Sequence, residues 1–143
     1  MKDPSWLGIR HVALRVHNLE GCLRFYSDFL GFSIEWQPDP DSIYLTTGQD
    51  NLALHRDDSM SSRGERSQDQ ALDHFGFVLT DIDAVDGWAQ RAEEFGVEIV
   101  QGLKTHRDGA RSFYMLDPDG NKIQILYHPP LSHLPGGRGD KKG

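Results

Sequence analysis

The chain has 143 residues, with 15 Lys and Arg against 22 Asp and Glu, which gives a formal net charge of -7 at pH 7. This length suits a single domain with a sizeable core. The acidic balance, with no basic cluster, disfavours nucleic acid as a partner. No apolar run approaches the roughly 20 residues of a membrane helix, and the N-terminus has no signal-peptide core. We therefore expect a soluble, cytoplasmic protein whose partner is a small molecule and not a membrane.

The only cysteine, Cys22, lies within a helical pattern. A lone cysteine excludes an internal disulfide and a cysteine-rich zinc site. The sequence therefore predicts a buried structural thiol, which fits a reducing compartment.

The first predicted strand covers residues 9–16, where β-branched and polar residues alternate and His11 shares a face with Ala13. Asn18 is a favourable N-cap, and apolar residues then recur at three- and four-residue steps until Gly31. This pattern predicts an amphipathic helix packed on a sheet. Turn-rich segments then separate three predicted short strands, at residues 32–36, 42–47 and 51–56.

A second unit repeats this order after a segment rich in Ser, Asp, Gln and Arg, which predicts a mobile connector over residues 57–71. A strand is predicted at residues 74–80, followed by a helix between Asp81 and Gly96 and a strand at residues 97–101. A hairpin is expected next, its strands at residues 112–116 and 122–127 joined by the turn at residues 117–121.

The run that starts at His11 therefore has a second copy that starts at His74, and each copy opens a βαβββ unit. We predict an α+β fold in which the two tandem units form a curved mixed sheet. The chain is expected to be one domain, with units at residues 7–56 and 72–128 and a flexible tail at residues 129–143.

The doubled βαβββ pattern, the His in each first strand and the turn Asp117-Pro118-Asp119-Gly120-Asn121 resemble the vicinal oxygen chelate superfamily. That superfamily includes glyoxalase I, extradiol dioxygenases, methylmalonyl-CoA epimerase, and fosfomycin- and bleomycin-resistance proteins. The resemblance implies half-barrel units that hold a divalent metal between them, a homodimer, and ligands from the first and last strand of each unit.

Carried over position by position, the resemblance implies His11, His74 and Gln124 as metal ligands. Gln124 stands where the family pattern has an acidic residue, and the fourth position falls on Ala53, which cannot bind a metal. His55 lies two residues further along the same strand face, so it is a candidate substitute ligand or acid-base group. Two imidazoles and an amide oxygen suit iron, nickel, zinc or manganese better than calcium or magnesium.

The C-terminal hairpin also resembles the extradiol dioxygenase signature, through His106, Tyr114 and the turn that follows. The resemblance implies that His106 and Tyr114 bind the substrate and transfer protons. With no carboxylate at position 124, we expect the acid-base role to pass to His55, His106 or Tyr114.

Three functions remain open on the sequence. The first is a metal-dependent enzyme, a lyase or an extradiol-type dioxygenase, whose small substrate chelates the metal through vicinal oxygens. The second is a metal-free binding protein of the bleomycin-resistance type, which would account directly for Ala53 and Gln124. A partner-binding domain is the third, and it leaves the paired histidines without a role.

Overall fold

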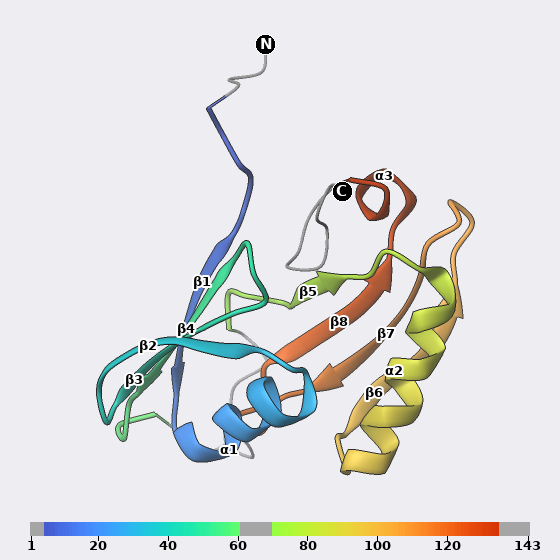
Figure 1. The fold of residues 1–143 in the computed structure, drawn as a ribbon. Coiled ribbons are helices and arrows are strands. Elements are labelled where there is room, and N and C mark those ends of the chain that lie inside the picture. The colour runs from blue at the N-terminus through green and yellow to red at the C-terminus, as the bar shows by residue number, and fades with distance from the viewer. Residues whose placement is uncertain (1–4, 61–69, 135–143) are drawn as a thin grey trace. The chain divides into compact units, whose positions relative to one another are not determined.

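The computed structural model describes residues 5–60 and 70–134. The chain divides into two compact units, residues 1–60 with 136–143 (unit 1) and residues 61–135 (unit 2). Each unit has the βαβββ order and one four-stranded mixed sheet, so the predicted α+β fold class is confirmed (Figure 1). Most of the predicted connector and of the predicted tail lies outside the described residues. No helix in residues 5–60 or 70–134 is long and apolar enough to cross a membrane.

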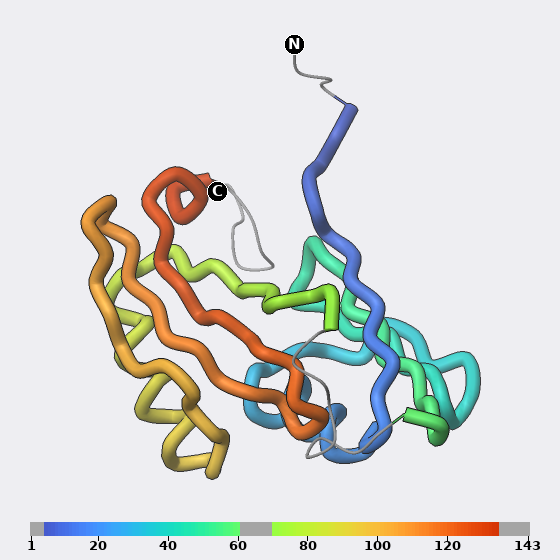
Figure 2. Tube along the Cα trace, turned by 180° about the vertical axis from the view of Figure 1, so that it is seen from behind, coloured from blue at the N-terminus to red at the C-terminus, as the bar shows by residue number. Residues whose placement is uncertain are grey.

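Unit 1 places its first strand beside its last, and its sheet order is β1-β4-β3-β2. The β1–β4 pair is parallel, whereas β4–β3 and β3–β2 are antiparallel, as the tube trace lets the reader follow (Figure 2). Its elements are β1 (His11–Val16), α1 (Leu19–Leu23), η1 (Arg24–Phe29), β2 (Ser33–Asp39), β3 (Ser42–Thr46) and β4 (Asn51–Arg56).

The helix of unit 1 begins and ends where the sequence predicts. The Asn18 side chain accepts a hydrogen bond from the Gly21 amide at 2.9 Å, and Gly31 ends the helix with φ 86°. After α1, however, η1 is π-helical, and the Leu30 amide donates to the Phe25 carbonyl across five residues. The sequence pattern does not show this widening. The buried residues of the segment from α1 to the start of β2 include the predicted thiol and four aromatic side chains: Cys22, Phe25, Tyr26, Phe29 and Phe32.

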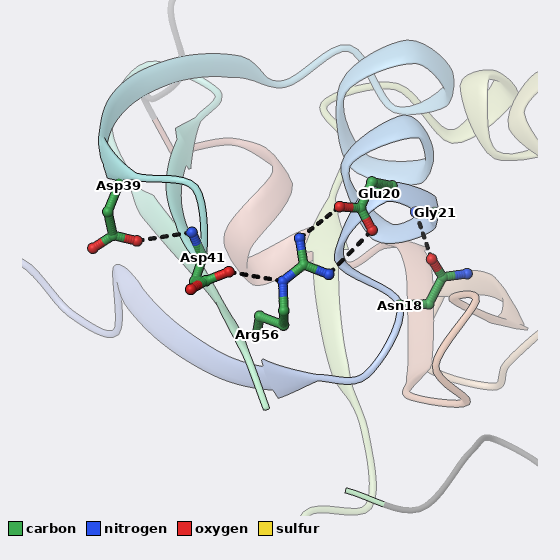
Figure 3. Close-up of polar contacts among 6 residues, drawn as sticks. All are labelled: Asn18, Glu20, Gly21, Asp39, Asp41 and Arg56. Atoms are coloured by element: carbon green, nitrogen blue, oxygen red, sulfur yellow. Dashed lines mark hydrogen bonds and ion pairs between the residues drawn. The ribbon is translucent and has the colours of Figure 1, made fainter. Parts of the chain in front are cut away.

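Arg56, at the end of β4, joins three elements of unit 1 (Figure 3). Its guanidinium donates to both carboxylate oxygens of Glu20 in α1, at 3.2 and 2.5 Å, and its Nε donates to Asp41 Oδ1 at 2.8 Å. Asp41 is held in turn by its amide, which donates to Asp39 Oδ1 at the end of β2. The hydrogen bonds from Arg56 lower the pKa of Glu20 from 4.5 to about 2.

Unit 2 has the equivalent order β5-β8-β7-β6, again with a parallel pair between its first and last strands. The helix α2 packs against three strands of this sheet, β6, β7 and β8. Its elements are β5 (Phe75–Val78), α2 (Ile82–Phe95), β6 (Ile99–Thr105), β7 (Arg111–Leu116), β8 (Lys122–Tyr127) and the short helix α3 (Pro129–Ser132).

Both predicted caps of α2 are present, since Asp81 accepts from the Asp83 amide at 2.9 Å and Gly96 adopts φ 84°. The strand predicted at residues 97–101 was placed too early. The Val97 amide still donates to a carbonyl of α2, and the pairing of β6 with β7 continues to Thr105. The predicted strand at residues 74–80 was too long, because the pairing of β5 with β8 covers only Phe75–Val78.

The turn between β7 and β8 depends on a buried carboxylate. Asp117 is fully buried and accepts from the Asp119 amide, the Asn121 amide and the Asn121 side chain, each at 2.9 Å. This side chain therefore satisfies three donors that the turn would otherwise bury without partners. The Asp-Pro-Asp-Gly-Asn sequence is thus a structural feature of the hairpin.

Candidate functional site

In unit 1, side chains of β1 and β3 alternate between a buried face and a more exposed face, which we call the open face of unit 1. The parallel register sets His11 opposite Asn51 and Ala13 opposite Ala53. His55 lies two residues beyond Ala53 on β4 and so shares this face, as predicted. The open face of unit 1 therefore carries both candidate histidines of that unit.

His11 belongs to a chain of hydrogen bonds. Its Nδ1 lies 2.8 Å from Asn51 Oδ1, and Asn51 Nδ2 donates to Glu35 Oε1 on β2 at 2.6 Å. A carboxylate can only accept, so the bond to Glu35 fixes which end of the Asn51 amide carries nitrogen. The Asn51 oxygen therefore faces His11, and Nδ1 of His11 carries the ring proton.

In unit 2, the corresponding open face brings three candidate residues together. Gln124 on β8 pairs in register with Gly76 on β5 and with Tyr114 on β7. His74 directly precedes β5, and its ring meets the Tyr114 ring edge-on with centroids 5.0 Å apart. A Cβ on Gly76 would lie 3.1 Å from the Gln124 carbonyl oxygen, so glycine lets β5 approach β8 closely beside Gln124.

His74 is held by an adjacent carboxylate. Its Nδ1 lies 2.6 Å from Asp73 Oδ2, and Lys122 Nζ lies 3.9 Å from the same oxygen. The hydrogen bond from His74, with the nearby charge of Lys122, lowers the pKa of the Asp73 carboxyl. Asp73 is therefore an acceptor at neutral pH, and His74 also carries its ring proton on Nδ1.

The two first-strand histidines thus share one protonation pattern. In each, Nδ1 donates to an oxygen that can only accept, and no described residue provides a hydrogen bond to Nε2. The Nε2 lone pair is the group that a metal ion binds, and a hydrogen bond at the other nitrogen is what orients ligand histidines. The side chains of His11 and His74 therefore fit a metal ion.

His55 and His106 have a different kind of partner. Nδ1 of His55 lies 3.1 Å from Ser42 Oγ, and Nε2 of His106 lies 3.3 Å from Ser112 Oγ. A hydroxyl can donate or accept, so neither ring is locked into one tautomer. A ring that can adopt either tautomer is able to give and take a proton, and the acid-base role of His55 and His106 stays a prediction.

Comparison with known proteins identifies the family of the chain. The model of the Glyoxalase/Bleomycin resistance protein/Dioxygenase superfamily matches residues 8–125. The chain belongs to this superfamily. Two relatives are named as transferases: Glutathione transferase FosA of Serratia marcescens is 29% identical over 82% of this chain and 78% of its own. Metallothiol transferase FosB of Staphylococcus haemolyticus is 30% identical over 82% of this chain and 81% of its own.

Solved structures agree on the fold of the superfamily. Lactoylglutathione lyase from Agrobacterium tumefaciens has a TM-score of 0.70 at 21% identity, covering 89% of this chain and 98% of that one. A superfamily protein from Alicyclobacillus acidocaldarius has a TM-score of 0.67 at 23% identity, covering 90% of this chain and 95% of that one. At these identities the likeness shows the superfamily fold.

The chain also contains a second repeat, on strands β3 and β7, which was not predicted from the sequence. Ser42 and Tyr44 on β3 occupy the same register positions as Ser112 and Tyr114 on β7, since Tyr44 pairs with Ala53 as Tyr114 pairs with Gln124. The signal was available as Ser-Ile-Tyr and Ser-Phe-Tyr. Without the register, however, such a short match has no weight.

Trp36 on β2 belongs to an exposed pair of aromatic rings. It is 59% exposed and stacks on Tyr44 with ring centroids 5.2 Å apart. Tyr44 in turn meets the His55 ring edge-on at 5.7 Å. Unit 1 therefore presents an exposed aromatic surface next to one of the candidate acid-base groups.

Residues 5–60 and 70–134 contain no cluster of three His, Cys, Asp or Glu side chains that could hold a metal. The ligand set that the superfamily implies contains only two residues of these types, because its third member is the amide Gln124. The set of His11, His74 and Gln124 therefore falls outside that criterion.

Proposed function

We propose that the protein is a metal-dependent enzyme in which His11, His74 and Gln124 hold one divalent ion: iron, nickel, zinc or manganese. The observation that carries this proposal is the shared protonation pattern of His11 and His74, which makes both Nε2 atoms metal donors. Three neutral ligands leave the ion with its full charge and with open positions. A small substrate with two adjacent oxygens fits such an ion.

The reaction we propose is the transfer of a thiol to an electrophilic carbon, and the names of the two transferase relatives support it. The thiol loses its proton, sulfur bonds to carbon, the bond from that carbon to a leaving oxygen breaks, and this oxygen takes up a proton. A bound ion supplies charge neutralisation at the substrate oxygens.

The residues of the chain handle the protons in this scheme. His55 and His106, each beside a serine hydroxyl, accept the thiol proton or return it through either tautomer. Tyr114 pairs with Gln124 and its ring contacts His74, and in this scheme its phenol donates to the leaving oxygen. The Trp36–Tyr44 surface offers apolar contact for the substrate.

The proposal is tested with wild-type protein, glutathione and a panel of small epoxides, with and without each of the four metals. We expect thiol consumption that needs the ion and stops on chelation. Tyr114→Phe should lower turnover about 100-fold or more with the metal content unchanged. Binding of a small organic molecule with no turnover under any metal would instead support the binding protein of the bleomycin-resistance type.

A further inference from the structure

The two units link a carboxylate to the histidine that opens each repeat in different ways. Unit 2 uses the residue directly before the histidine, since Asp73 contacts His74 at 2.6 Å. In unit 1 the preceding residue is Arg10, whose guanidinium donates to the carbonyl of Leu7 and the side chain of Gln49. In unit 1, therefore, the residue before the histidine does not accept the hydrogen bond from the ring, and another residue must do so.

Asn51 accepts the hydrogen bond from His11, and Glu35 orients the Asn51 amide. Asn51 occupies the first position of β4, opposite His11, and its amide bridges the His11 ring and the Glu35 carboxylate at 2.8 and 2.6 Å. An isolated asparagine can present either its oxygen or its nitrogen to the ring. The carboxylate of Glu35 removes this choice, because a reversed amide would set two acceptor oxygens against each other.

We propose that Glu35 and Asn51 are positioning residues that hold His11 in the tautomer with the proton on Nδ1, so that Nε2 is the metal donor. This inference rests on the proposed metal-dependent function for its purpose, but the tautomer exists in the metal-free protein. The three proposed ligands include no carboxylate. Each ligand histidine is nevertheless linked to one by hydrogen bonds, His74 directly to Asp73 and His11 through Asn51 to Glu35. Partners of this kind fix the tautomer and the orientation of a ligand histidine.

The test measures the tautomer directly. Full-length, metal-free protein is labelled with nitrogen-15, its imidazole correlations are recorded by NMR, and His11 is assigned from the signal lost in His11→Gln. We expect Nδ1–H in the wild type and a shift toward Nε2–H in both Glu35→Gln and Asn51→Leu. Asp39→Asn is the matched control, because it removes one carboxylate from the same strand and should leave the His11 signal unchanged.

Zinc titration of the same proteins gives the second readout. We expect Glu35→Gln and Asn51→Leu to weaken Zn²⁺ binding by about 10- to 100-fold, with Asp39→Asn within about twofold of the wild type. Glu35→Asp should recover part of the loss. Glu35→Gln changes a single surface group, so it keeps the test valid if Asn51→Leu fails to fold.

The outcomes separate the two proposals. An unchanged His11 tautomer in both variants, or Nε2–H in the wild type, overturns the positioning role. A tautomer that shifts as expected in a protein that binds no Zn²⁺ supports the positioning role and counts against the metal-dependent function.

Discussion

Gln124 is the residue that most limits the strength of the proposed metal site. Its amide oxygen carries only a partial charge, whereas a carboxylate at the same position would add full Coulombic attraction to a divalent ion. The backbone around it is already specialised, since Gly76 leaves room beside it and Tyr114 pairs across from it. A change of side-chain charge alone should therefore be tolerated here.

We predict that Gln124→Glu strengthens metal binding by about tenfold or more, equivalent to about 1.4 kcal/mol. Titration with Zn²⁺ or Mn²⁺ against a competing chelator measures the change. Gln101→Glu is the control, because Gln101 pairs with the other side of Tyr114 and places the same charge on a neighbouring strand. Equal gains in the two variants would mean that charge in general, and not coordination at position 124, raises the affinity.

His11 and His74 could be predicted as candidate metal ligands from the repeat, because they open equivalent runs of sequence. The roles of Asn51, Glu35 and Asp73 do not follow from it. Asn51 and Glu35 are 16 residues apart and meet His11 only through the register of β1 with β4. Contacts across strands of this kind depend on pairing that no local pattern encodes.

The contact between α1 and the end of β4 depends on ionised Glu20. The pKa of Glu20 is about 2 in the folded chain against an ordinary 4.5, so its contact with Arg56 stabilises the fold at and above about pH 4.5. That contribution is lost as the pH falls toward 2. It is a small contribution, because the Glu20 side chain is 65% exposed.

We predict that Glu20→Gln lowers the urea midpoint of unfolding at neutral pH. The difference from the wild type should shrink between about pH 4.5 and about pH 2. Glu93→Gln, on the exposed side of α2, should show no such difference. A gap between Glu20→Gln and wild type that stays constant down to the lowest pH would contradict the assigned ion pair.

The β7–β8 hairpin should be more sensitive than this surface contact. Asp117→Ala leaves three buried donors without an acceptor, so we predict a loss of about 3 kcal/mol in the free energy of unfolding. Asp108→Ala removes one bond in an exposed turn and should cost less than about 1 kcal/mol. Urea denaturation of both variants checks the contrast, and similar losses would argue against it.

Element boundaries show where sequence patterns stop being informative. The caps at Asn18 and Asp81 were predictable because a cap is a local interaction. The extent of β6 could not be predicted from the sequence. Its pairing with β7 contains two register shifts, and only that pairing continues the strand to Thr105. The π-helical turn after α1 likewise has no signature in the spacing of its apolar residues.

At the scale of the whole molecule, the edge strands β2 and β6 occupy equivalent places in their sheets. Both expose large apolar side chains, among them Ile34, Val100 and Leu103. Exposed apolar edges favour pairing with another chain. From this feature and the resemblance noted in the sequence, we propose that the protein forms a homodimer.

We predict that sedimentation at micromolar concentration gives twice the chain mass, and that Leu103→Lys shifts the protein toward single chains. Lys104→Arg, next to it on β6, is a charge-neutral control. A wild type that sediments as single chains at this concentration would remove the homodimer from the account.

Metal content measures most directly whether His11, His74 and Gln124 hold one divalent ion. Protein purified without chelator, then exposed separately to iron, nickel, zinc and manganese and desalted, is analysed by mass spectrometry for bound metal. We predict one ion per chain in the wild type, and none in His11→Ala or His74→Ala. Wild-type protein that retains none of the four metals while it still binds a small organic ligand would contradict the account.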